Sequence, residues 1–106
     1  MKKIEIYRTA DGKTPFLDWI DSLSEEIQAR IMKTVKRLGE GGSKNIVKAL
    51  GDGIFELKMH FGPGHRVYFG EEKNVILILL TGGDKGTQKR DIEKAKEYWR
   101  NHAKNI

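Results

Sequence analysis

Apolar residues recur at two different spacings along the chain, and these spacings predict where its helices and strands lie. Between residues 24 and 39 the interval is four, four and three residues, which places a stripe on one side of a helix: Ile27, Ile31, Val35 and Leu38. Between residues 54 and 61 the interval falls to two, which places four apolar side chains on one side of a strand: Phe55, Leu57, Met59 and Phe61. From about Gln88 to His102 helical spacing returns, with Thr87 as the expected N-cap.

Shorter elements complete the predicted order. A strand covers Ile4 to Arg8, and Thr14 followed by Pro15 starts a helix that ends near Leu23. Two more strands are expected at residues 65–69 and 75–80, with Gly82-Gly83 ending the second, and residues 43–53 are expected to be a loop. The order β-α-α-β-β-β-α predicts one α+β domain, residues 1–106, with helices packed on a small antiparallel sheet.

The predicted hairpin around Gly62-Pro63-Gly64 brings several functional side chains together. A loop of those three residues would place His60 opposite Arg66 and Lys58 opposite Tyr68, with partners about 5 Å apart. One face would then carry five polar or aromatic side chains: Glu56, Lys58, His60, Arg66 and Tyr68. The other face would be apolar.

Composition narrows the chemistry that this face could perform. There are no cysteines, so disulfides, thiol nucleophiles and Cys-based zinc sites are excluded. The net charge of +5 favours a polyanionic partner. The first residues lack a signal-peptide core, and the longest apolar run, Val75 to Leu80, is too short to span a bilayer. We therefore expect a cytoplasmic protein without a membrane partner.

Cations beside a histidine and a tyrosine suit a phosphodiester of RNA. RNA carries its own nucleophile in the 2′-hydroxyl, so a protein need only move protons and stabilise negative charge. Arginine matches phosphate oxygens, and aromatic rings stack on unpaired bases. His60 and His65 have no carboxylate or thiol to complete a metal shell, so no metal or other cofactor is expected. The alternative is that this face is an ordinary solvated surface.

The segment Thr81–Thr87 has two interpretations. It lacks the spacing of a phosphate-binding loop for nucleotides. Free amides at the start of the following helix could still hold a phosphate, with Lys85 and Lys89 adding charge. An ordinary glycine-rich turn explains the segment equally well.

Several motifs resemble one known group of proteins. Residues Gly53–Lys58 with His65–Phe69 are similar to the hairpin motif of RelE/ParE-superfamily toxins. Residues Leu79–Gln88 with Asp91–Lys96 are similar to the "GGDKxTQxxDIxxA" ending of phage-derived Gp49-like, HigB-type addiction-module killer proteins, and Thr14–Leu23 matches the same subgroup. The resemblance covers nearly the whole chain.

This resemblance implies a RelE-like fold and a toxin that cleaves mRNA in the ribosomal A site, held in check by a cognate antitoxin protein. It implies that Arg66 contacts the scissile phosphate, that Lys58 and His60 act as base or charge stabiliser, and that Lys85 completes the site. Tyr68 is expected in the same catalytic group. Lys48, Lys89 and Arg90 are expected to bind RNA.

Two other functions are compatible with the same sequence. One is a ParE-like poison that binds DNA gyrase without cleaving RNA. The other is an inactive basic domain that only titrates its antitoxin. The convergence of Lys58, His60 and Arg66 on one sheet face favours RNA cleavage.

Overall fold

A mixed sheet of five strands forms the centre of the molecule, and its order places the last two strands in the middle. The computed structural model describes residues 1–104. The strand order is β1-β5-β4-β3-β2. The strands are β1 (Lys3–Ile6), β2 (Val47–Gly51), β3 (Ile54–Lys58), β4 (Arg66–Glu72) and β5 (Ile76–Gly83).

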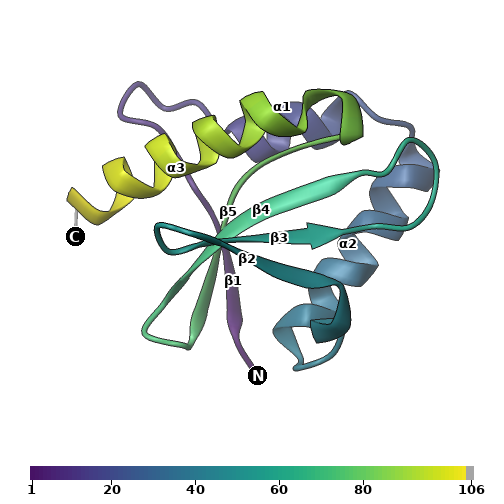
Figure 1. Ribbon diagram of the computed structural model, residues 1–106, viewed down its shortest axis with the longest axis horizontal. Helices are drawn as coiled ribbons and strands as arrows, with labels where there is room; N and C mark the ends of the chain where they lie inside the picture. The colour runs from purple at the N-terminus through teal and green to yellow at the C-terminus, as the bar shows by residue number, and fades with distance from the viewer. Residues whose placement is uncertain (105–106) are drawn as a thin grey trace.

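The helices cover both faces of this sheet (Figure 1). They are α1 (Pro15–Asp21), α2 (Glu25–Gly39) and α3 (Gln88–Lys104), with short 3₁₀ turns at η1 (Lys44–Ile46) and η2 (Lys85–Thr87). The predicted stripe of α2 is confirmed, since Ile31, Val35 and Leu38 are buried. Ser24 caps this helix by accepting a hydrogen bond from the amide of Ile27 at 3.3 Å.

Two hydrophobic clusters lie on opposite faces of the sheet. One joins α1 and α2 to the face that carries Leu57, Val67 and Phe69. The other joins α3 to the face that carries Ile54, Tyr68 and Leu80. The α+β class is therefore confirmed, because helices and a largely antiparallel sheet share these two clusters.

Three predicted features of the sheet are wrong. β1 pairs with β5 in parallel, so the sheet is not wholly antiparallel. The predicted loop at residues 43–53 contains β2, an edge strand that pairs with β3. Gly82 and Gly83 do not end the fifth strand but belong to it, because they pair with Val67 and Arg66 of β4. Neighbouring side chains rest on both glycines: the indole of Trp19 on Gly82, and Asp91 with Thr87 on Gly83. A β-carbon at either glycine would overlap those groups.

No helix in the described range, residues 1–104, has both the length and the apolar composition needed to cross a membrane.

Candidate nucleic-acid interface

The β3–β4 hairpin has a longer loop than the sequence indicates, and this changes its register. Lys58 pairs with Arg66 and Glu56 pairs with Tyr68, so the predicted pairs His60–Arg66 and Lys58–Tyr68 are wrong. β3 ends at Lys58, and the amide of Met59 donates a hydrogen bond to the carbonyl of His65 at 2.9 Å. The shift is two residues, so each side chain stays on the face that the alternation predicts.

The face itself is far less exposed than predicted. Glu56, Arg66 and Tyr68 retain only 3%, 4% and 0% of their accessible surface, whereas Lys58 and His60 are exposed. Tyr68 belongs to the cluster beneath α3, and its hydroxyl has no hydrogen-bond partner within residues 1–104. The expectation of an open face is wrong for these three residues, because α3 covers the β4 end of it.

Arg66 is held by two partners at the edge of α3. Its Nη1 donates to the carbonyl of Gly64 at 2.7 Å, and its Nε lies 3.6 Å from Oε2 of Glu56. The same Glu56 oxygen accepts a hydrogen bond from Nε2 of Gln88 at 2.9 Å. Gln88 is the first residue of α3, so this chain of contacts ties the start of the helix to β3 and β4. Nothing in the sequence pattern marked Gln88 as a support of the Glu56–Arg66 pair.

Two adjoining hollows open above Arg66, and together we call them the basic groove. One, of about 410 Å³, includes Lys58, His60, Arg66 and Lys85 in its lining. The other, of about 420 Å³, includes Lys48, Lys58, His60 and Arg66. Four predicted catalytic residues therefore line the basic groove, together with Lys48, which was predicted to bind RNA: Lys58, His60, Arg66 and Lys85. Burial beneath α3 keeps Tyr68 out of their lining.

Lys89 and Arg90 lie elsewhere on α3. They line a separate hollow of about 320 Å³ with Gly86, Thr87 and Glu93. Both side chains are exposed. The structure therefore does not bring them into the basic groove.

The turn before α3 is closed by its own side chains. Asp84 accepts hydrogen bonds from the amides of Gly86 at 2.8 Å and Thr87 at 3.2 Å, and Thr87 Oγ1 accepts one from the amide of Asp84 at 3.2 Å. Asp84 is thus the N-cap of η2, and the predicted N-cap of the last helix, Thr87, is the last residue of η2 and directly precedes α3. Because Asp84 occupies the amides of Gly86 and Thr87, the structure favours the ordinary turn over the phosphate cradle, and Lys85 is the residue of this turn that lines the groove.

The tip of the hairpin is anchored by aromatic packing. His65 is buried, with its ring 6.2 Å from that of Trp19 and 5.7 Å from that of Phe61. The guanidinium of Arg30, from α2, lies 3.8 Å from the centre of the Phe61 ring. These contacts hold residues 59–65, and with them His60, against α1 and α2.

Charge and burial also affect Tyr68. Burial, and then the negative charge of Glu56, raise the pKa of the Tyr68 hydroxyl well above its ordinary value. A tyrosine held neutral beneath a helix is poorly placed to act on a ligand in the groove. The chemistry available there comes from one imidazole and four cations: His60, Lys48, Lys58, Arg66 and Lys85.

Comparison with known proteins identifies relatives of the chain. Residues 18–100 match the family described as phage derived protein Gp49-like (DUF891). The chain is also 43% identical over 82 residues to an uncharacterized protein of Haemophilus influenzae, a match that covers 76% of this chain and 82% of that protein. The matched range includes the hairpin, the turn before α3 and most of α3.

Proposed function

The chain belongs to the phage-derived Gp49-like family, a RelE-superfamily toxin-like family, and we propose that it is a toxin that cleaves mRNA on the ribosome. Membership of this family is consistent with the toxin of a toxin–antitoxin pair and suggests an antitoxin partner. The observation that supports RNA cleavage is the basic groove, in which three exposed cationic or imidazole side chains surround a buried arginine: Lys58, His60 and Lys85 around Arg66.

The groove suits the transfer that cleaves RNA. The 2′-oxygen attacks the adjacent phosphorus and loses its proton, while the 5′-oxygen leaves and gains one, which yields a 2′,3′-cyclic phosphate and a 5′-hydroxyl. His60 performs a proton transfer, for which imidazole is suited near neutral pH. Lys58, Lys85 and Arg66 stabilise the charge that accumulates on the phosphate oxygens.

The Arg66 side chain is held in one conformation before any RNA binds. Its guanidinium is already held by Gly64 and Glu56, so binding RNA would not require a flexible side chain to be ordered. The exposed lysines supply charge but no fixed geometry. We therefore expect the ribosome to align the 2′-oxygen with the leaving oxygen, and free RNA to be cleaved poorly.

The test uses exposed residues, because substitution of the buried Arg66 also affects folding. Lys58→Gln and His60→Gln are each expressed in cells, and the 5′ ends of mRNA are mapped. Lys73→Gln is the matched control, since Lys73 is exposed and follows the opposite end of β4. We expect the wild type and Lys73→Gln to cut mRNA at codon-related positions and to arrest growth. Both groove variants should cut at least about 100-fold less.

Other outcomes would overturn the proposal. Full cleavage by the groove variants would remove the basic groove from the reaction. Growth arrest with accumulated gyrase–DNA breaks, and no cuts in mRNA, would indicate a gyrase poison instead.

A further inference from the structure

We propose that the free edge of β2 is the docking site for an extended segment of the antitoxin in which apolar and acidic side chains alternate. The inference rests on the proposed function for the identity of the partner. It is carried by three features of β2: an unpaired edge, an apolar hollow on one side and the basic groove on the other.

The edge of β2 is open to pairing. β2 is the last strand in the sheet order and pairs only with β3 among the described strands. It covers five residues, Val47–Gly51, and its register shifts between Ala49 and Gly51. An edge strand presents a row of backbone donors and acceptors that an extended peptide can complete.

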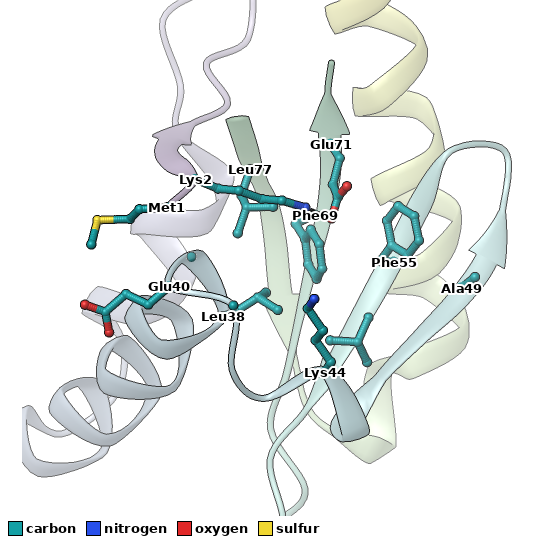
Figure 2. A pocket seen from close by; sticks show the side chains of 13 residues that line it. Met1, Lys2, Leu38, Glu40, Lys44, Ala49, Phe55, Phe69, Glu71 and Leu77 are labelled. Carbon is teal, nitrogen blue, oxygen red and sulfur yellow. Dashed lines mark hydrogen bonds and ion pairs between the residues drawn. The ribbon is translucent and has the colours of Figure 1, made fainter. Parts of the chain in front are cut away.

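On the α2 side, β2 borders a hollow of about 430 Å³, which we call the apolar hollow (Figure 2). Val47 and Ala49 belong to its wall, and the stacked rings of Phe55 and Phe69, 5.5 Å apart, continue that wall. Leu38 closes the hollow from the end of α2. This volume is within the range of pockets that accept a ligand or a large side chain.

The charges around the apolar hollow cancel. Its lining includes two lysines and two glutamates, Lys2, Lys44, Glu40 and Glu71, and Lys2 pairs with Glu71 at 3.0 Å. The lining therefore has no net charge that would attract a charged side chain of the docked segment. The occupant that this wall favours is apolar.

On the α3 side, the same strand borders the basic groove. Lys48 is opposite Glu56 in the register, and it lines the groove with Lys58 and His60. Glu56 is buried and already paired with Arg66, so the exposed charge here is positive. Acidic side chains complement it.

A strand added to β2 could fill the apolar hollow and cover the basic groove at the same time. Successive side chains of a strand point to opposite faces of a sheet. Every second residue would therefore enter the apolar hollow, and the residues between them would lie over Lys48 and its neighbours. A helix on this edge could not complete the backbone pairing. Docking of such a segment would also cover the groove in which RNA is expected to bind.

The experiment measures binding of a fluorescent peptide of about eight residues in which Glu and Val alternate. A second peptide has the same composition with its Glu and Val in separate blocks. A third has the alternating sequence, with N-methyl groups on alternate residues of one edge to block pairing. We expect the block and methylated peptides to bind at least about tenfold more weakly, the effect of losing one or two hydrogen bonds or side-chain insertions.

Protein variants test each side of β2 separately. Lys48→Glu should weaken binding of the alternating peptide about tenfold, and a peptide with Lys in place of Glu should then bind this variant better than the wild type. Ala49→Glu should also weaken binding of the alternating peptide, because it places a charge in the wall of the apolar hollow that the valines are expected to enter. Lys73→Glu is the matched control and should bind as the wild type does. Lys73 is exposed and follows Glu72, the end of β4 that lies away from Arg66 and the basic groove.

The results separate this inference from the proposed function. Equal binding of all three peptides, or equal binding by Lys48→Glu and the wild type, would overturn the docking site. A lack of new hydrogen-exchange protection at the amides of residues 47–51 in the peptide complex would do the same. Peptide binding without mRNA cleavage would contradict the nuclease alone, and cleavage without peptide binding would contradict the docking site alone.

Discussion

The two ends of α3 contact the same sheet by different means. At the C-terminal end, Trp99 lies flat on Gly70 of β4, and its ring stacks on that of His102 at 5.3 Å. At the N-terminal end, the polar side chains of Thr87 and Asp91 rest on Gly83 of β5, and Gln88 reaches Glu56. A rigid indole fills space, whereas short polar chains direct their neighbours. We infer that the first end mainly stabilises the fold and that the second end mainly positions Arg66.

The largest expected effect tests the polar end. Arg66→Met leaves Glu56 buried without its ion-pair partner, which should lower the free energy of unfolding by about 3–5 kcal/mol. Adding Glu56→Leu removes the orphaned charge and should restore most of that stability, but not mRNA cleavage. Urea unfolding of the single and double variants measures this. If Arg66→Met is as stable as the wild type, the ion pair is not the support we infer.

A smaller loss is expected at the aromatic end. A β-carbon on Gly70 would overlap the Trp99 ring, so Gly70→Ala should cost about 1–3 kcal/mol of stability through overpacking. A second substitution, Trp99→Leu, should cost less in the Gly70→Ala background than in the wild type, and this double-mutant cycle is measured by urea unfolding. Equal costs in both backgrounds would show that the two residues are not coupled.

A glycine substitution at the N-terminal end of α3 should affect activity more than stability. Gly83→Ala displaces the ends of the Asp91 and Thr87 side chains, which bond rotations can accommodate, so the stability loss should stay at about 1 kcal/mol. The start of α3 would shift with it, and mRNA cleavage should fall about 100-fold, because small misplacements are costly in catalysis. Mapped 5′ ends and unfolding curves on the same preparation compare the two. A variant that is severely unstable yet fully active would contradict our division of α3.

The smallest effect concerns Tyr68, which sequence analysis placed among the catalytic residues. Its hydroxyl is buried without a hydrogen bond, so Tyr68→Phe should leave mRNA cleavage unchanged and stability equal or about 1 kcal/mol higher. A loss of cleavage with intact folding would return Tyr68 to the reaction.

Alkaline pH gives an independent measure of the same burial. The folded-state pKa of Tyr68 is raised, so the unfolded chain releases the phenol proton at a lower pH than the folded chain does. The stability that the neutral Tyr68 hydroxyl contributes is fully present below the unfolded pKa of about 10 and is lost as pH rises toward the folded value. The wild type should therefore lose more stability than Tyr68→Phe between pH of about 9 and 11, followed by urea unfolding at each pH. Parallel curves would show that the hydroxyl is not in the environment described.

The sequence by itself determined the class of the fold and the composition of each sheet face. Helical and strand spacings depend only on local geometry, so the stripe of α2 and the alternation of β3 and β4 are visible in the order of residues. A register shift of two residues preserves the face of every side chain. Lys58, His60 and Arg66 could thus be grouped correctly even though their pairing was wrong.

Tertiary structure decided which of those residues are exposed. α3 folds back over this face from 20 or more residues away in sequence and buries Tyr68, and Arg66 is buried beside Glu56, whereas Lys58 and His60 stay exposed. It also decided that β2 is a strand, since Lys48, Ala49 and Leu50 carry little alternation and become extended by pairing with β3. Burial and strand pairing depend on contacts between segments that are distant in the sequence, so the local spacing of apolar and polar residues does not predict them.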